Sequence, residues 1–463
     1  MKKHYLLLLF FLVCLLLGDV GKAIAGRRSS SLTVAPYFTS HVVLQRGSSV
    51  PVWGTVAPGT GITVSFNYQA VTQSVLTTTD ANGKWMARLI LETAIGTPGG
   101  TMVINGGGTT ITFTDVLVGE VWVLSGQSNI NVKLKDCDGG PEAVNDSAAY
   151  PDIRLYLVPQ TGPLTEKWEP SNPINTPDWS GVGFFFARAL FSEMTTPVPI
   201  GLIQVAKNGT PIADWTTYGG SNNGKLYKDK IKPLQPFAIR GVIWYQGEDD
   251  GGQESSALKY YDMLPELIAN WRTDWGQGEF PFYYVQLALI SGRPNWAIVR
   301  DAQVSTLDVT SNTAMACIID VPTIPTTEIH PKDKEPVGYR LALAARALIY
   351  GETNLVYSGP IRDVSQSSIQ GNTIAIGFAH TDGGLVTDDG LDPGPFMLAG
   401  TDGVYYPAAT AEIVGDTVVV SSPSVPNPKS VRYCWGSYPV CNLFNNYGNG
   451  YGLPASPFQL TLP

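Results

Sequence analysis

The sequence predicts an α/β protein in which a parallel sheet with helices on both faces lies between two β-rich, sandwich-like regions. Between residues 116 and 350, apolar segments alternate with helix-like segments, which is typical of a parallel sheet. On either side, short Val, Thr and Ile runs are separated by turn residues. The predicted divisions are a signal peptide at 1–25, a β-sandwich domain at 26–115, the α/β domain at 116–350 and a β-rich domain at 351–463.

The first 25 residues have the composition of a secretory signal peptide. Lys2 and Lys3 precede an apolar run at 6–17, and small residues precede Gly26. This run is short for a membrane span, so we expect cleavage and a secreted, lysosomal or vacuolar protein with no membrane partner; an uncleaved anchor is the alternative. Cleavage removes three lysines and one aspartate, which changes the formal net charge from -9 to -11. Nucleic acid is not an expected partner of so acidic a chain.

The elements of the central region place several polar residues at strand ends. Strands are predicted at 120–124, 201–205, 239–245 and 282–287, and helices at 182–191, 257–270, 298–307 and 336–350. Ligands of open α/β sheets bind beyond the carboxyl ends of the strands. Ser128, Gly209 and Gln246 each follow a predicted strand, so we expect them to converge on one edge of the sheet. In the last region, strands are predicted at 372–378 and 416–421.

Three short motifs supply the residue types of an acyl-transfer site. Ser128 lies in Gly-Gln-Ser-Asn, Gln246 in Trp-Tyr-Gln-Gly-Glu and His330 in Ile-His-Pro. A serine nucleophile needs a neutral base, and His330, one of only four histidines, lies on a loop before a helix. An amide at a strand end can donate to a developing oxyanion. The simpler alternatives are a helix N-cap for Ser128, a buried amide bonded to backbone for Gln246, and an exposed, idle His330.

Four cysteines remain after signal cleavage, an even number that is compatible with disulfides in a secreted chain. Cys434 and Cys441 are close enough in sequence for a hairpin disulfide, and a Cys137–Cys317 pair follows by elimination. Metal binding is not expected, because the chain contains no Cys-x-x-Cys or His-x-x-x-His cluster. No organic cofactor is implied.

Taken together, the motifs resemble the sialate O-acetylesterase family of SGNH-type hydrolases. The matching segments are 119–129, 244–248, 329–331 and 338–343, with further matches at 43–47, 52–54, 300–303, 431–433 and 453–458. The resemblance covers nearly the whole mature chain and implies an SGNH-hydrolase-like sheet. It implies that Ser128 is the nucleophile and His330 the base. The oxyanion would be held by the Ser128 N–H, the Gly209 N–H and the Gln246 side chain.

The chain departs from the family pattern in the segment that carries Gly209. Residues 207–212 read Lys-Asn-Gly-Thr-Pro-Ile, where the family usually reads Trp-Gly-Gly-Thr-Pro-Ile. An asparagine at position 208 can replace glycine only partly if that position has positive φ. Asn208 also begins a glycosylation sequon, as does Asn145. A glycan on Asn208 would obstruct the proposed site, so Asn145 is the predicted acceptor.

A second departure concerns the third member of the triad. Glu328 stands two residues before His330, where the family often has aspartate. Glu328 is the predicted orienting acid, although its longer side chain changes the geometry. Asp320 is the runner-up carboxylate, and a Ser-His dyad oriented by a backbone carbonyl is a third possibility.

The sequence therefore predicts a carbohydrate O-acetylesterase whose partner is an O-acetylated sugar or glycoconjugate. By resemblance, the substrate is an O-acetylated sialic acid, whose carboxylate needs a cation; Arg300 is a candidate with an equally plausible structural role. One alternative is an acetylxylan or other polysaccharide deacetylase of the same fold. The other is a non-catalytic glycan-binding protein, which the change at Lys207 and Asn208 motivates.

Overall fold

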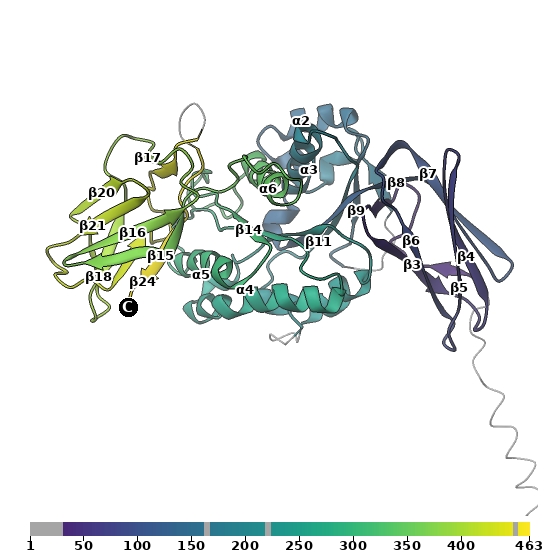
Figure 1. Ribbon diagram of the computed structural model, residues 1–463, viewed down its shortest axis with the longest axis horizontal. Coiled ribbons are helices and arrows are strands. Elements are labelled where there is room, and N and C mark those ends of the chain that lie inside the picture. The colour runs from purple at the N-terminus through teal and green to yellow at the C-terminus, as the bar shows by residue number, and fades with distance from the viewer. Residues whose placement is uncertain (1–30, 162–166, 218–223, 448–451) are drawn as a thin grey trace, which may run out of the picture. The chain divides into compact units, whose positions relative to one another are not determined.

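The computed structural model describes residues 31–161, 167–217, 224–447 and 452–463 (Figure 1). The predicted signal peptide at 1–25 lies outside these residues. The chain forms two compact units, and the described part of the first consists of residues 31–38, 51–89 and 101–113. The second consists of residues 39–50, 90–100 and the described residues from 114 to 463. The chain therefore passes between the two units more than once before residue 114.

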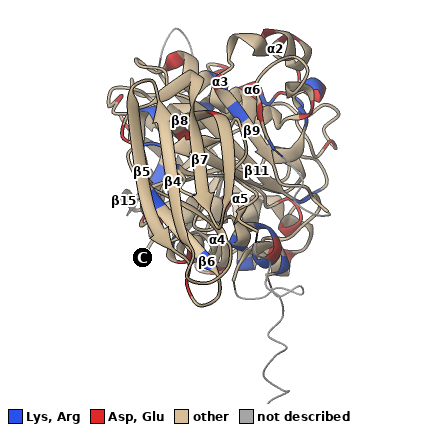
Figure 2. Ribbon diagram, turned by 90° about the vertical axis from the view of Figure 1, so that its right-hand side faces the viewer, with Lys and Arg blue, Asp and Glu red and all other residues tan. Residues whose placement is uncertain are grey.

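The first unit is built of β-strands, three of which (β3, β6 and β7) also include residues of the second unit. One sheet contains β1 (Thr33–Val34), β3 (Ser49–Thr55) and β6 (Lys84–Ile90). A second group contains β4 (Gly61–Tyr68), which pairs antiparallel with both β5 (Val71–Thr78) and β7 (Ile95–Gly106). Alternate residues of β4 and β6 are buried, as expected for strands with one face against a core. The strands β4, β5 and β7 contain no charged residue (Figure 2).

The second unit contains a seven-strand path of order β10-β9-β11-β8-β12-β13-β14. Its strands are β8 (Thr109–Gly126), β9 (Ile153–Leu157), β10 (Trp168–Pro170), β11 (Ile200–Ala206), β12 (Gly241–Tyr245), β13 (Phe282–Val285) and β14 (Thr313–Ala316). All neighbours on this path are parallel except β10, which is antiparallel to β9. A short strand, β2 (Val43–Gln45), also pairs in parallel with β8.

Helices cover both faces of this sheet, which confirms the predicted fold class. Figure 1 shows α3 (Gly181–Glu193) and α6 (Glu335–Leu348) on one face, and α4 (Glu254–Trp275) and α5 (Trp296–Val309) on the other. Each of the four predicted helices lies within or close to one of them. Shorter helical segments are α2 (Gly140–Asp146), η2 (Ser128–Asn131), η3 (Leu134–Asp136), η4 (Ser147–Ala149), η5 (Thr176–Asp178), η6 (Ile212–Trp215), η7 (Tyr227–Ile231), η8 (Lys232–Leu234) and η9 (Asp250–Gly252).

The strand order reverses beside β8, and this reversal fixes where a ligand can bind. After β8 the chain forms β9 and then β11 on one side, and it crosses to β12 on the other side. Gly126 at the end of β8 is in register with Ala206 of β11 and with Tyr245 of β12. The ends of these three strands therefore lie together at the switch point of the sheet, where open α/β proteins bind ligands.

The last part of the second unit is β-rich. Its strands are β15 (Ile361–Gln370), β16 (Thr373–Ala379), β17 (Leu385–Thr387), β18 (Phe396–Ala399), β19 (Tyr405–Pro407), β20 (Thr410–Val414), β21 (Thr417–Ser421), β22 (Ser430–Tyr433), β23 (Leu443–Asn445) and β24 (Phe458–Thr461). Two four-stranded sheets, β15-β16-β21-β20 and β19-β18-β22-β24, contribute to one apolar core. Ile376 of β16 and Val431 of β22, for example, are both fully buried in it.

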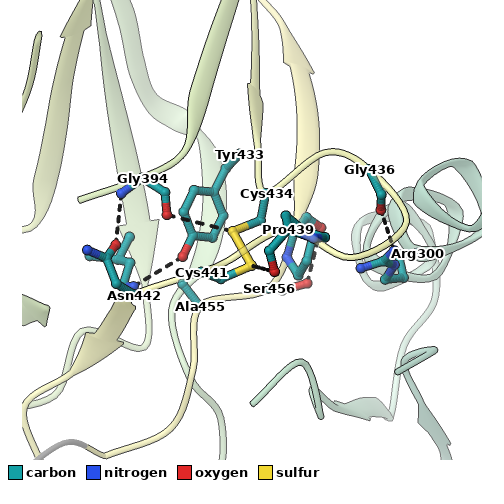
Figure 3. Close-up of a disulfide and its surroundings, with 12 residues drawn as sticks. Arg300, Gly394, Tyr433, Cys434, Gly436, Pro439, Cys441, Asn442, Ala455 and Ser456 are labelled. Carbon is teal, nitrogen blue, oxygen red and sulfur yellow. Dashed lines mark hydrogen bonds between the residues drawn. A yellow bond between two sulfur atoms is a disulfide. The ribbon is translucent and has the colours of Figure 1, made fainter. Parts of the chain in front are cut away.

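The cysteines of the described chain adopt two different states. Cys434 and Cys441 form a disulfide at the end of β22 (Figure 3). Cys137 and Cys317 are free, buried thiols, so their pairing by elimination is wrong. The Cys137 thiol instead donates to the carbonyl of Lys133 within its own turn. Burial raises the pKa of each free thiol to about 12, which keeps both protonated at neutral pH.

Candidate active site

Ser128 lies at the start of η2, immediately beyond the end of β8. Gly126 makes this turn possible, because its φ is 130° and a Cβ there would lie 2.1 Å from the carbonyl oxygen of Tyr245 on β12. Ser128 is half-buried, and its hydroxyl does not cap η2, whose N-cap residue is Gln127. The hydroxyl oxygen instead lies 2.8 Å from Nε2 of His330. The simple N-cap interpretation of Ser128 is therefore wrong.

His330 and Glu328 complete a chain of hydrogen bonds with Ser128. The His330 Nδ1 lies 3.1 Å from Glu328 Oε1, and the same oxygen accepts from the His330 backbone N–H at 2.8 Å. An ionised carboxylate only accepts hydrogen bonds, so the proton of a neutral imidazole belongs on Nδ1. Nε2 is then left to accept the hydroxyl proton of Ser128. This is the arrangement that a serine nucleophile and its general base require.

The charges around His330 act on its protonation in opposite directions. Burial lowers the pKa of His330 below its usual 6.5, Glu328 raises it, and Lys334 lowers it further. The pKa of Glu328 is lowered, first because its carboxylate accepts the His330 backbone N–H. At neutral pH the pair therefore consists of a neutral imidazole and a carboxylate, so His330 can accept a proton.

The other candidate acid and the other histidines lie elsewhere. Asp320 forms a two-pronged ion pair with Arg340, at 2.6 and 2.5 Å, and is not the carboxylate beside His330. The Nδ1 of His41 contacts Asp115 at 2.7 Å. The ring of His380 packs edge-on against Tyr357. Of the three histidines in the described residues, His330 is the one that reaches Ser128.

Gly209 lies on the loop that follows β11, next to Ser128 across the sheet. It has a φ of 60° and is exposed, whereas Asn208 is not among the residues with positive φ. Asparagine at 208 is therefore accommodated, and its side chain accepts a hydrogen bond from Asn131 at 2.8 Å. Within the described chain, neither the Ser128 N–H nor the Gly209 N–H donates to a protein acceptor. Both donors remain available to a ligand.

Gln246 does not have the free amide that was expected of an oxyanion donor. Its side chain is fully buried, and Nε2 donates to the Thr210 carbonyl at 3.1 Å and to Asp250 at 2.6 Å. Its oxygen accepts from the hydroxyl of Tyr260 at 3.1 Å. Since both amide protons are used, the structure corrects the predicted role: Gln246 braces the loop that carries Gly209. The alternative of a buried, satisfied amide is the better description.

Arg300 is also placed differently from the prediction that it binds a substrate carboxylate. It is fully buried in α5 and donates to the carbonyls of Gly436 at 2.5 Å and Ser437 at 3.2 Å (Figure 3). Its guanidinium thus fastens the α/β part of the second unit to the loop after β22. A buried side chain that is engaged in this way cannot meet a sugar, so its role is structural.

A buried polar cluster behind Ser128 was not predicted from the sequence. Asn129, Glu248 and Lys334 are all at most 2% exposed, and they are joined by hydrogen bonds. Asn129 and Glu248 belong to motifs that were singled out for their neighbours Ser128 and Gln246. Asn129 and Glu248 could have been predicted from the sequence, because both are polar residues near the end of an apolar strand. Lys334 could not have been, because a lysine before a helix normally lies in solvent.

The remaining predictions concern surface chemistry. Asn145 is exposed on α2, while Ser147 of its sequon is buried; glycosylation of Asn145 stays a prediction.

In the described part of the chain, no three His, Cys, Asp or Glu side chains cluster in a way that could hold a metal ion. No helix in the same residues has the length and apolarity needed to cross a bilayer.

Comparison with known proteins identifies the family. A family profile described as carbohydrate esterase, sialic acid-specific acetylesterase, matches residues 118–344. The crystal structure of a carbohydrate acetylesterase from Xanthomonas citri is 36% identical, with a TM-score of 0.83 over 93% of this chain and 99% of that one. The chain belongs to the carbohydrate esterase family of sialic acid-specific acetylesterases. It is therefore a carbohydrate esterase, and the alternative of a non-catalytic glycan-binding protein is not retained.

Curated members of this family show the same relationship at lower identity. The sialate O-acetylesterase of Mus musculus is 28% identical over 416 residues, which cover 71% of this chain and 75% of that protein. The sialate O-acetylesterase of Homo sapiens is 29% identical over 391 residues, covering 71% and 73% respectively. The matched region of the family profile contains Ser128, Gly209 and His330, so this esterase carries its candidate site inside the family domain.

Proposed function

We propose that this esterase removes O-acetyl groups from sialic acids through a covalent acetyl-enzyme on Ser128. The observation that supports this mechanism is the 2.8 Å contact between Ser128 Oγ and His330 Nε2, with Glu328 on the opposite ring nitrogen. A base in this position can take the hydroxyl proton as the oxygen attacks. The reaction class agrees with the family of carbohydrate esterases.

In the first half of the reaction, Ser128 Oγ attacks the acetyl carbonyl carbon and its proton passes to His330 Nε2. The carbonyl oxygen becomes an oxyanion, and the backbone N–H groups of Ser128 and Gly209 are the donors that stabilise it. Collapse of this intermediate breaks the bond to the sugar oxygen. The sugar oxygen leaves with the proton from His330, and the acetyl group remains on Ser128.

In the second half, water replaces the sugar oxygen. His330 accepts a proton from water as the water oxygen attacks the acetyl carbon, and the same two N–H groups hold the new oxyanion. Ser128 Oγ then leaves and recovers its proton from His330, so acetate is released and the enzyme is regenerated. Glu328 stays ionised throughout and balances the positive charge that forms on the imidazole.

The proposed sialate substrate carries a carboxylate, and we propose that Lys207 meets it. The Lys207 backbone N–H donates to the carbonyl of Gly126 at 3.1 Å, so Lys207 begins the loop beside the Ser128 turn. Its side chain is half-exposed. This position takes over the role that the sequence had suggested for Arg300. The similarity to the sialate O-acetylesterases of Mus musculus and Homo sapiens supports the same substrate class.

A second candidate is an esterase that deacetylates xylan or another polysaccharide. The carbohydrate acetylesterase from Xanthomonas citri, which matches nearly the whole chain, is consistent with this substrate class as well as with the first. The fold alone does not distinguish the two, because one fold can host several specificities.

We also propose that the protein enters the secretory pathway. The positively charged start, apolar run and small residues before Gly26 support a cleaved signal, and the Cys434–Cys441 disulfide fits an oxidising compartment. N-terminal sequencing of the protein recovered from the medium of expressing cells tests this, and a chain that begins at Met1 would contradict it.

The decisive experiment measures acetate release from 9-O-acetylated sialic acid and from acetylated xylan by wild type and Ser128→Ala. Loss of the hydroxyl should lower kcat/KM by about 10⁴-fold. Ser365→Ala, an exposed serine of β15, is the matched control and should keep full activity. Turnover of sialate that disappears in Ser128→Ala supports the proposal. Turnover of xylan alone transfers the mechanism to the second candidate, and undiminished activity of Ser128→Ala contradicts the mechanism.

A further inference from the structure

Three buried polar side chains connect the elements on which Ser128 and His330 lie. Lys334 Nζ donates to Asn129 Oδ1 at 2.5 Å. Asn129 Nδ2 donates to Glu248 Oε1 at 2.6 Å and to the Ile329 carbonyl at 3.0 Å. Asn129 follows Ser128 in the chain, and Ile329 precedes His330. One amide side chain therefore joins the nucleophile turn directly to the loop of the base.

The cluster is costly to bury, which argues that it has a purpose beyond stability. Glu248 is 2% exposed and Lys334 is fully buried, with its ammonium 5.1 Å from the centre of the Tyr245 ring. Lys334 is also the N-cap residue of α6, where the helix dipole disfavours a cation. Burial lowers the pKa of Lys334 to about 8 and raises that of Glu248 to about 7. Residues that conflict with local preferences, such as a buried charge or a cation at a helix N-terminus, are concentrated at functional sites.

We propose that Asn129, held by Lys334 and Glu248, is a positioning residue that locks the Ser128 turn against the His330 loop. This inference rests on the proposed function of Ser128 and His330. The His330 loop has little regular structure of its own between β14 and α6. The bond from Asn129 to the Ile329 carbonyl fixes the backbone next to the base, and Lys334 and Glu248 fix the amide plane of Asn129. The Ser128–His330 bond is then formed before substrate arrives.

Lys334 has a second effect through its charge. His330 is faced by Glu328, which raises its pKa, and by Lys334, which lowers it. The charged and titratable groups around Lys334 are Cys137, Glu248, Asp333 and Glu328. The ammonium thus favours the neutral imidazole that accepts the Ser128 proton. A residue that served only to fill the core would not affect the pKa of His330.

The first test compares Asn129→Ala with Asn445→Ala. Asn445 is a fully buried amide of β23 that donates to the carbonyls of Ser358 and His380, so it matches Asn129 in burial but lies in the C-terminal β-rich part. Hydrolysis of p-nitrophenyl acetate is measured per folded molecule. We expect kcat to fall about 10- to 100-fold in Asn129→Ala with KM within about twofold, because a small misplacement of reacting groups has this cost. Asn445→Ala should lose thermal stability and keep kcat.

Conservative variants separate positioning from folding. Glu248→Gln keeps an oxygen that accepts from Asn129 and should retain most of kcat, whereas Glu248→Ala should lose about tenfold. Lys334→Met removes the cation and should move the acid limb of kcat/KM to higher pH, because the pKa of His330 rises. Equal losses in Glu248→Gln and Glu248→Ala, or an acid limb that stays in place or moves to lower pH in Lys334→Met, would overturn the proposal.

Ser128→Ala, measured in the same assays, distinguishes the two proposals from each other. If Ser128→Ala is inactive while Asn129→Ala keeps the wild-type kcat, only the positioning role fails. If Ser128→Ala is active, the proposed function fails and the positioning role loses its basis. A loss of kcat in Asn445→Ala equal to that in Asn129→Ala would mean that lost stability explains both, and the positioning role would again be overturned.

Discussion

The two halves of the candidate site are held in place in different ways. Ser128 and Gly209 follow neighbouring strands whose ends are in register, with Gly126 opposite Ala206. His330 instead lies on a segment without regular secondary structure, of which residues 324–327 are exposed. Ser128 is therefore placed by backbone hydrogen bonds of the sheet, and His330 by a few side-chain and loop contacts. Substitutions around His330 should consequently lower the activity by graded amounts, whereas the Ser128 turn should tolerate few substitutions.

The most severe change on the base side is His330→Ala. Removal of the general base should lower kcat/KM for an acetyl ester by about 10²- to 10⁴-fold, with thermal stability nearly unchanged because the ring is half-exposed. Steady-state kinetics and a thermal melt measure the two quantities. His41→Ala, which removes a histidine that contacts Asp115, serves as the control and should be as active as wild type. Comparable activity of the two variants would argue against His330 as the base.

Replacing the orienting acid should have a smaller effect. We expect Glu328→Gln to lower kcat about tenfold, less than the roughly 10⁴-fold loss known for a buried triad acid, because Glu328 is partly exposed. Glu328 raises the pKa of His330, so its neutralisation should lower that pKa and move the acid limb of kcat/KM to lower pH. A pH profile between 4 and 9 tests the direction. A shift to higher pH would show that Glu328 does not act on His330 through its charge.

Lys207→Met tests whether the half of the site at the strand ends, which contains Ser128 and Gly209, also selects the substrate. An exposed ion pair contributes at most about 1 kcal/mol, so KM for an acetylated sialic acid should rise about two- to fivefold. KM for p-nitrophenyl acetate, which has no carboxylate, should stay the same. An equal change for both substrates would indicate a general effect on the loop, and no change for the acidic sugar would remove Lys207 from substrate recognition.

Arg300→Met should have the smallest effect on catalysis. The variant leaves the Gly436 and Ser437 carbonyls without their donor, so the free energy of unfolding should fall by about 1–3 kcal/mol. KM for acidic and neutral esters should both remain at the wild-type value. Chemical denaturation and kinetics on the two substrates check these expectations. A rise in KM confined to the acidic sugar would restore Arg300 as a substrate ligand.

Most strands and helices of the α/β region could be predicted from the sequence, because the periodicity of apolar residues in a strand or helix is a local property. The predicted strands at 120–124 and 201–205 lie within β8 and β11, and the helix at 336–350 nearly coincides with α6. The strand order and its reversal beside β8 depend on long-range pairing, which no local pattern reveals. The short loop between Cys434 and Cys441 was a local signal for their disulfide, but the states of Cys137 and Cys317 were set by distant packing.

For the site, the sequence by itself predicted which residues could carry chemistry, and the tertiary structure decided which of them lie together. Ser128, His330 and Glu328 could be proposed from the sequence because their residue types and motifs suit acyl transfer. Gln246 and Arg300 have equally suitable types, yet both side chains are fully buried and bonded to neighbouring protein groups, Gln246 to Thr210 and Asp250, and Arg300 to the Gly436 carbonyl. Asn129 and Lys334, 205 residues apart, meet only in the folded chain. A side chain's chemistry is fixed by its own atoms, whereas its exposure and its partners are fixed by segments far away in sequence.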